Sequence, residues 1–294
     1  MSGKGHVAVA TDGSAHSHRV LPHASLLAQA LGSRLLLLRI IDPKADVHHQ
    51  RGESHDAALE HARERFSAEL SSTLSRLGLY GAVSVADRRE GEKTSRSLLR
   101  ASIDAGASVV AMDSRGHGAL RHVLHGSVTM EVMGATSLPV MLTGPNLEGA
   151  MANHAPYRIL LTSDGSPASR AAAEGLAPLV ENGPFQVTLM RVHEHAPGGA
   201  DDTAQLDECA AQLEELRTLL PPLLPVKTLV REIPRGAGID TAITEQALEL
   251  GAHAIALSTH GVSARRHLLM GSVATTLLGR SPLPLILVRS ELKV

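Results

Sequence analysis

Residues 7–14 of the chain read VAVATDGS, a short apolar run that ends in Asp-Gly-Ser. Such a run, closed by a turn signal, is typical of a strand buried in a parallel sheet. Residues 20–31 then follow helical spacing, with Ser14 or Ser17 available to cap the helix and Gly32 to end it. A strand that passes directly into a helix predicts an α/β fold.

The segment belongs to an internal repeat. Asp12-Gly13-Ser14 recurs as Asp164-Gly165-Ser166, and Arg39-Ile40 recurs as Arg191-Val192, both at an offset of 152 residues. Later in the copy the offset is 145, and the matched positions are Gly91, Gly106, Ala107, Gly116, Arg121-His122, Gly126-Ser127-Val128, Gly134 and Leu138-Pro139. A duplication with one shortened segment explains both offsets. We therefore expect domains at residues 1–146 and 155–294, with a linker at 143–156 that is rich in turn-forming residues.

Strand and helix periodicities alternate within each copy. In the first copy the expected strands are 7–11, 34–41, 82–86, 108–112 and 138–142, and the expected helices are 20–31, 59–77, 94–105 and a short one from Ser127. This alternation predicts two tandem doubly wound domains, each with a five-stranded parallel sheet flanked by helices. Ligands of such sheets bind beyond the carboxyl ends of the strands, where the strand order reverses.

The composition excludes several classes of function. With two Tyr, two Phe and no Trp, the chain lacks the aromatic platforms of single-stranded nucleic-acid binders, and its formal charge of −2 offers no basic field to DNA or membranes. We find neither a signal peptide nor an apolar span of about 20 residues. The single cysteine, Cys209, shares a predicted helix face with leucines, which favours packing over reactivity, and it fits a reducing cytoplasm.

The loop after the fourth strand is the most informative segment of each copy. It reads Asp113-Ser114-Arg115-Gly116, nine residues and Gly126-Ser127 in the first copy, and Ser258-Thr259-His260-Gly261, nine residues and Gly271-Ser272 in the second. A Gly-Ser pair that opens a helix offers free N–H groups, a positive dipole end and a hydroxyl to a phosphate. The alternative is a plain loop and N-cap, which a single such spacing does not exclude.

These motifs resemble the universal stress protein family, whose ATP-binding signature is Gly, two residues, Gly, nine residues, Gly and Ser or Thr. The opening Asp-Gly-Ser and the Pro-containing fifth strand match as well, in both copies. The resemblance implies the adenine nucleotide alpha hydrolase-like fold and an ATP or other adenine-nucleotide ligand. It also implies adenine contacts at Asp12, Ile40, Asp164 and Val192, and ribose and phosphate contacts at Gly116, Gly126, Ser127, Gly261, Gly271 and Ser272.

Both copies depart from the signature at its first glycine, which is Asp113 in one and Ser258 in the other. A carboxylate near a triphosphate adds a repulsion of about 1 kcal/mol or more even when solvent screens it. A serine carries no charge and can donate a hydrogen bond, although either side chain crowds the approach that glycine permits. We therefore rank the second site above the first.

Other chemistry has little support in the sequence. Basic residues crowd both loops, where they either bind phosphate or stay solvated: Arg115, His117, Arg121, His122, His125, His260, Arg265, Arg266 and His267. His193 and His195 would share a strand face, but no third ligand accompanies them, so we expect no metal beyond Mg²⁺ accompanying ATP. No P-loop, hydrolase elbow or nucleophile–base pair is present, so we assign no catalytic residue.

We therefore expect a cytoplasmic tandem universal stress protein that binds an adenine nucleotide, ATP first, and acts as a stress-response binder or switch. The alternatives are a nucleotide-independent interaction module with degenerate sites and, third, an enzyme of at most slow ATP hydrolysis. The family's dimers imply that the fused copies pack as a pseudo-twofold pair, and whether the chain forms a further homodimer stays open. An unidentified protein partner is expected; nucleic acid and membrane are not.

Overall fold

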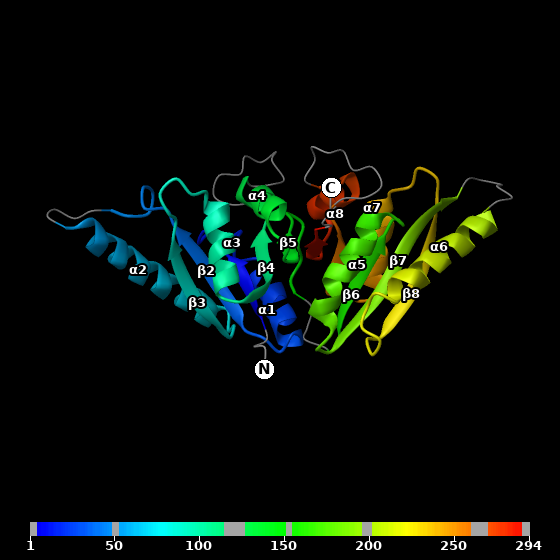
Figure 1. Ribbon diagram of the computed structural model, residues 1–294, viewed down its shortest axis with the longest axis horizontal. Helices are drawn as coiled ribbons and strands as arrows, with labels where there is room; N and C mark the ends of the chain where they lie inside the picture. The colour runs from blue at the N-terminus through cyan, green and yellow to red at the C-terminus, as the bar shows by residue number, and fades with distance from the viewer. Residues whose placement is uncertain are drawn as a thin grey trace. The chain divides into compact units, whose positions relative to one another are not determined.

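The computed structural model describes residues 5–48, 53–114, 127–150, 155–195, 202–259 and 270–289. The chain divides into two compact units, Met1–Thr136 and Ser137–Val294, whose elements are labelled in Figure 1. The expected domains, 1–146 and 155–294, differ from these units in the assignment of residues 137–146. Those domain boundaries stay a prediction.

Strands and helices alternate in the first unit in the expected order. Three parallel pairings, β1 with β2, β1 with β4 and β2 with β3, give the strand order β3-β2-β1-β4. The elements are β1 (His6–Ala10), α1 (Leu21–Ala30), β2 (Leu35–Ile41), α2 (His55–Arg76), β3 (Gly81–Asp87), α3 (Thr94–Asp104), β4 (Ala107–Asp113) and α4 (Ser127–Ala135).

The second unit repeats this plan with two additional strands. Parallel pairings join β10 to β9, β9 to β6, β6 to β7 and β7 to β8, and β5 pairs antiparallel with β10. The elements are β5 (Val140–Thr143), β6 (Tyr157–Ser163), α5 (Pro167–Val180), β7 (Phe185–His195), α6 (Asp202–Arg217), β8 (Val226–Pro234), α7 (Ile239–Glu249), β9 (Ala254–Ser258), α8 (Ser272–Arg280) and β10 (Leu285–Val288).

The doubly wound α/β fold predicted from the sequence is confirmed. In each unit the first strand, β1 or β6, lies between the strand that follows it in the chain and the fourth strand of the copy, so the strand order reverses at that point. Helices pack along the strands, α5 against β6, β9 and β10, and α6 against β7 and β8 (Figure 1). The reversal creates the crevice at the carboxyl ends where such folds bind ligands.

One pairing was not expected: β5, the last strand of the first copy, pairs with β10, the last strand of the second. Met141 lies opposite Ile286, and the two strands run antiparallel. All four residues of each strand are buried. An apolar strand leaves a row of backbone donors and acceptors open at its edge, and each of these two strands satisfies that row in the other.

The core is aliphatic, as the scarcity of aromatic residues requires. Most strands bury valine, leucine and isoleucine, whereas β3 and β8 are largely partly exposed. Phe66 and Phe185 add the two phenylalanine rings. Cys209 of α6 is 5% exposed and packs among the buried residues, which agrees with the structural role expected of it. No described helix is long and apolar enough to cross a membrane.

The expected capping of the first helix by Ser14 or Ser17 is wrong, although Ser166, which matches Ser14, does cap its helix in the second copy. Ser166 is the N-cap of α5, and its hydroxyl accepts a hydrogen bond from the Ser169 amide. Ser14 accepts the equivalent bond from the Ser17 amide, but α1 begins only at Leu21, after Val20. Residues 15–20 form turns instead, and Pro22 lies in the first turn of α1, where proline is tolerated because its missing N–H would have no partner within the helix.

The glycine of each Asp-Gly-Ser turn is required by both conformation and space. Gly13 has φ 81° and Gly165 has φ 76°, values that other residues adopt only with strain. A Cβ atom at Gly165 would lie 2.5 Å from Arg191 Nη1 and 2.5 Å from Gln212 Oε1. The side chains below the turn therefore pack directly on its backbone.

We expect Leu160→Ala to lower the free energy of unfolding by about 2–5 kcal/mol, because Leu160 of β6 is fully buried and its loss leaves a cavity. Leu223→Ala is the control: Leu223 is 95% exposed, and the change should stay within about 0.5 kcal/mol. Urea unfolding followed by circular dichroism measures both. Equal shifts in the two variants would contradict the assigned core.

Gly165→Ala should destabilise more than Gly236→Ala. Both glycines have positive φ, 76° and 83°, but a Cβ at Gly236 would meet nothing within 4 Å. Gly236→Ala therefore reports the conformational strain alone, about 1 kcal/mol, and the excess at Gly165 reports the close packing below the turn. Thermal unfolding of the two variants, side by side, gives the difference; no excess at Gly165 would show that Arg191 and Gln212 move aside freely.

Candidate functional site

The carboxyl ends of β6, β7 and β9 form one edge in the second unit. Ser163, the last residue of β6, lies opposite Arg191 of β7, and Leu161 lies opposite Ala256 of β9. Asp164 and Ser258 therefore follow at the same edge, next to the point where the strand order reverses. Asp164 is exposed, and Val192 and Ser258 are partly exposed, so a ligand at this edge has access to them.

Hydrogen bonds fix the Asp-Gly-Ser turn of the second unit. Asp164 Oδ1 accepts from the Ser166 amide at 3.1 Å and from Ser169 Oγ at 3.0 Å. Ser163 Oγ accepts from the Gly165 amide at 3.1 Å. The Asp164 carboxylate is thus held by the start of α5 and keeps a defined orientation at the strand end.

A backbone bond brings the start of α8 to the end of β9. The Gly271 amide donates to the Thr259 carbonyl oxygen at 2.8 Å, immediately after the strand. Gly271 is the N-cap of α8 in extended conformation, and among the described residues no side chain caps this helix. The first N–H groups of α8 and the exposed Ser272 consequently stand at the same edge as Ser258.

The first unit builds the same edge with different chemistry. Asp12 accepts from the Ser14 amide at 3.0 Å, and Ile40 is the next-to-last residue of β2. Asp113 ends β4 and is only 5% exposed, so a buried carboxyl group occupies the position that Ser258 takes in the second unit. Thr129 of α4 donates to the Asp113 carbonyl oxygen at 3.4 Å, and α4 begins at Ser127.

Several predicted site residues lie outside the described residues. These are the loop glycines Gly116, Gly126 and Gly261, together with the nine basic residues of the two loops. The structure brings together Asp164, Val192, Ser258, Gly271 and Ser272 in the second unit, and Asp12, Ile40 and Ser127 belong to the corresponding edge in the first.

The sequence analysis assigned no role to the arginines of the repeated Arg-Ile and Arg-Val pairs. Their side chains, Arg39 and Arg191, reach under the two Asp-Gly-Ser turns, where a Cβ at Gly13 would lie 2.6 Å from Arg39 Nη1. The recurrence of an arginine at the same offset as the turn was the available signal. The helix side chains that approach the same turns, Glu69 of α2 and Gln212 of α6, could not be matched from the sequence, because the offset changes between the second strand and the loop.

His18 lies beside the turn of the first unit. Burial lowers the pKa of its imidazole and Arg76 lowers it further, while Glu69 and Asp12 act in the opposite direction. The ring is therefore neutral at pH 7 and adds no positive charge to this edge. The corresponding residue of the second copy, Arg170, is positively charged and forms ion pairs with Glu174 and Glu215.

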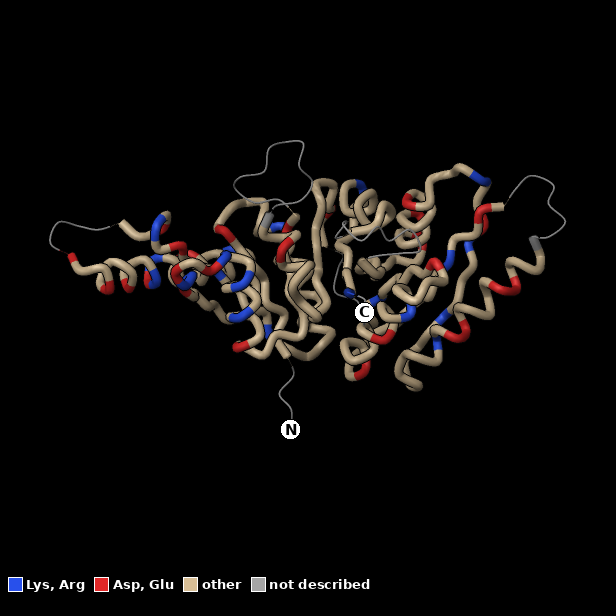
Figure 2. The backbone as a smooth tube through the Cα atoms, turned by 45° about the horizontal axis from the view of Figure 1, so that its top comes forward, with Lys and Arg blue, Asp and Glu red and all other residues tan. Residues whose placement is uncertain are grey.

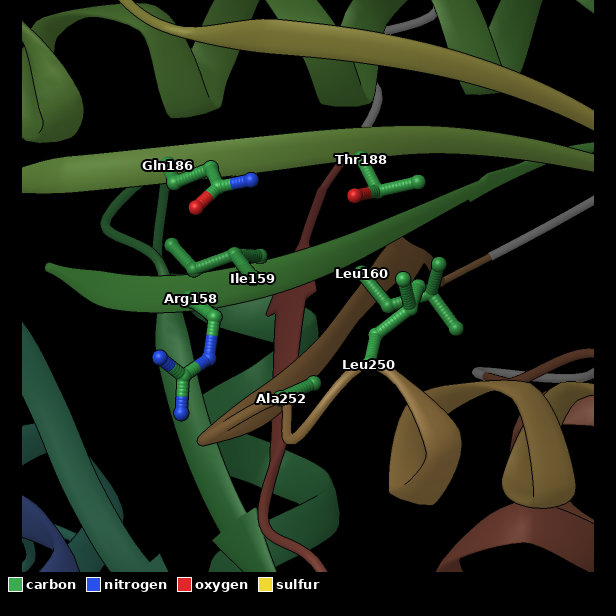
Figure 3. Close-up of a pocket in the computed structure, with 7 residues that line it drawn as sticks. All are labelled: Arg158, Ile159, Leu160, Gln186, Thr188, Leu250 and Ala252. Atoms are coloured by element: carbon green, nitrogen blue, oxygen red, sulfur yellow. The ribbon is translucent and has the colours of Figure 1, made fainter.

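A small cavity in the second unit is not part of this edge. Its side chains come from the amino-terminal halves of β6 and β7 and from the end of α7 (Figure 3), and its volume of about 20 Å³ suits a single water molecule. The cavity is lined by Arg158, Ile159, Leu160, Gln186, Thr188, Leu250 and Ala252.

The described part of the chain gathers neither metal ligands nor charge of one sign. His193 and His195 both lie in β7, as expected, but no group of three or more His, Cys, Asp or Glu side chains is arranged there to hold a metal ion. Acidic and basic residues alternate along both units in Figure 2.

Two solved structures that align along nearly the whole chain support the fold. A universal stress protein from Archaeoglobus fulgidus DSM 4304 aligns over 98% of this chain and 97% of its own, with 18% identity and a TM-score of 0.62. A functionally unknown protein from Pseudomonas aeruginosa PAO1 aligns over 97% and 92%, with 17% identity and a TM-score of 0.54. A universal stress protein in complex with cAMP aligns over 47% of this chain and 100% of its own, with 18% identity and a TM-score of 0.35.

No curated protein matches the chain's sequence significantly. The sequence model of the universal stress protein family, in contrast, matches twice, at residues 5–144 and 157–289. These two matches cover both copies of the repeat. The chain therefore belongs to the universal stress protein family, as a tandem member with two copies of the family's domain.

Proposed function

We propose that the chain binds an adenine nucleotide, ATP first, at the carboxyl edge of the second unit. The observation that carries this proposal is the 2.8 Å hydrogen bond from the Gly271 amide to the Thr259 carbonyl oxygen. It brings the N-terminus of α8 to the end of β9, beside the Asp164 turn. A helix N-terminus with uncapped N–H groups attracts a phosphate by hydrogen bonding and by its dipole.

Each site residue has a role in this proposal. The Asp164 carboxylate and the Val192 backbone contact the adenine, while Gly261, Gly271 and Ser272 hold the ribose and phosphates. Ser258 carries no charge and offers a hydroxyl at the position of the missing signature glycine. Any Mg²⁺ would arrive with the ATP, and no residue is assigned as a nucleophile or base, so turnover would be slow at most.

The first unit is the weaker site in the same scheme, with Asp12, Ile40, Gly116, Gly126 and Ser127 as its contacts. The buried Asp113 carboxyl supports this ranking, because a negative charge at the end of β4 repels a phosphate there. If neither copy binds a nucleotide, the chain acts instead as a nucleotide-independent interaction module with degenerate sites.

Nucleotide occupancy would act as a switch in stress response: contacts of the nucleotide with residues 113–127 and 258–272 would favour one conformation for a protein partner. We place this activity in the cytoplasm, since the chain's single cysteine, Cys209, has no second cysteine to pair with in the chain and is buried. Light scattering of the purified chain determines whether a homodimer forms.

Acid extraction of purified protein should release an adenine nucleotide, and calorimetry should detect ATP binding. Gly271→Val should weaken ATP binding more than tenfold, or by about 1.4 kcal/mol. Gly271 has φ −68° and ψ 164°, which valine adopts readily, so the side chain fills ligand space without straining the helix start. Gly149→Val, where a Cβ meets nothing within 4 Å, is the control and should bind ATP normally.

Three kinds of result would contradict these proposals. No released nucleotide and no heat at millimolar ATP would overturn nucleotide binding and favour the interaction module. Gly126→Val should weaken ATP binding less than Gly271→Val does. Equal losses of ATP affinity would contradict the ranking of the two units. Linear phosphate release over many turnovers, abolished by Gly271→Val, would show that the protein is an ATP-hydrolysing enzyme.

A further inference from the structure

The two copies place the same arginine under the same turn but surround it differently. In each, the guanidinium packs on the glycine of Asp-Gly-Ser, and a helix side chain approaches from the other side. A Cβ at Gly13 would lie 2.9 Å from Glu69 Oε1, and a Cβ at Gly165 would lie 2.5 Å from Gln212 Oε1. Glu69 of α2 and Gln212 of α6 are therefore structural counterparts.

In the first copy, two carboxylates balance the charge of Arg39. Arg39 Nη1 lies 3.6 Å from Glu69 Oε2, and Nη2 lies 3.7 Å from Asp46 Oδ1. The Phe66 ring covers the guanidinium, with its centroid 3.5 Å from Cζ. Two carboxylates and an aromatic face thus surround one positive charge.

The second copy keeps the arginine, but its described residues do not repeat these partners. Counting from Gln212 places Cys209 at the position of Phe66, three residues before the glutamate counterpart, so at these two positions α6 carries neither the ring nor the carboxylate that α2 carries. Arg191 forms no ion pair with any described carboxylate, and its buried Nη1 has no hydrogen-bond partner among the described residues. Gln212 Oε1 is likewise buried and unpartnered.

The nearest acidic side chain on α6 lies on the solvent side. Glu208 accepts a hydrogen bond from Gln212 Nε2 at 3.0 Å, so the amide of Gln212 separates this exposed carboxylate from Arg191. Water screens an exposed charge far better than a buried one. Both turns carry an aspartate, Asp12 and Asp164, so the described residues of the two copies differ in Glu69 and Asp46, which pair with Arg39 alone. The potential under the turn that ends β6 is therefore the more positive of the two.

We propose that Arg191 is an electrostatic positioning residue that draws an anionic ligand to the second copy, and that residue 212 decides which copy does so. This inference rests on the proposed function, since the edge concerned is the proposed nucleotide site. A partly buried guanidinium without a carboxylate partner costs stability, as groups kept for binding often do. The ligand class is a polyanion, and a neutral ligand should not respond to residue 212.

The test moves one carboxylate by a single helical turn. In the double variant Glu208→Gln with Gln212→Glu the net charge is unchanged, and Arg191 gains the partner that Arg39 has. We expect ATP to bind about three- to tenfold more weakly, as one charge near a polyanion predicts, while adenosine affinity stays the same. Glu208→Gln alone is the matched control and should not weaken ATP binding. The double variant should melt at the same or a higher temperature than wild type.

Two results would overturn the inference. Unchanged ATP affinity in the double variant would show that Arg191 exerts no effect on the ligand, and an equal loss for ATP and adenosine would show that residue 212 only shapes the turn. Inorganic tripolyphosphate separates this inference from the proposed function. If tripolyphosphate stabilises the wild type against heat more than it stabilises the double variant, while ATP does not bind, the nucleotide assignment is wrong and the role of Arg191 stands. A wild type that responds to neither probe contradicts both.

Discussion

Parallel pairing of one central strand with neighbours on both sides is the constraint on which each unit depends. β6 pairs with β7 on one side and β9 on the other, and β1 pairs with β2 and β4 in the same way. Because all of these strands run in one direction, their carboxyl ends meet, and the turns that follow must share one edge. Within the second unit, the Asp-Gly-Ser turn, the start of α8 and Arg191 come to the same edge only for this reason.

Most of the fold could be predicted because its signals are local. Apolar runs that end in Asp-Gly, and helical spacing after them, depend on neighbouring residues alone, and the repeat tests each assignment twice. The antiparallel pairing of β5 with β10 could not be predicted, since four-residue apolar strands carry no information about their partners. The start of α1 was misjudged for a related reason: Ser14 makes its expected hydrogen bond, but α1 begins only at Leu21, with Pro22 in its first turn.

The candidate site likewise contains residues that the sequence predicted and residues that only the packed structure reveals. Asp164, Ser258 and Gly271 could be found from motif spacing, because backbone turns and helix starts have fixed sequence requirements. The contrast between Glu69 and Gln212 could not, since it depends on which face of α2 and α6 meets the turn and on an insertion that shifts the numbering between the copies. Arg191 was visible as a repeated residue, but its lack of a carboxylate partner is a property of the packed structure.

The difference between Glu69 and Gln212 has a consequence for how such a protein changes over generations. In an assembly of two identical chains, every substitution appears in both subunits, so a residue that strengthens one site and a residue that stabilises the other cannot coexist. A fused chain is free of that symmetry. One copy can keep the arrangement that favours folding, with Arg39 between two carboxylates, while the other gives it up at a single position. Duplication within one gene thus allows the two halves to specialise separately.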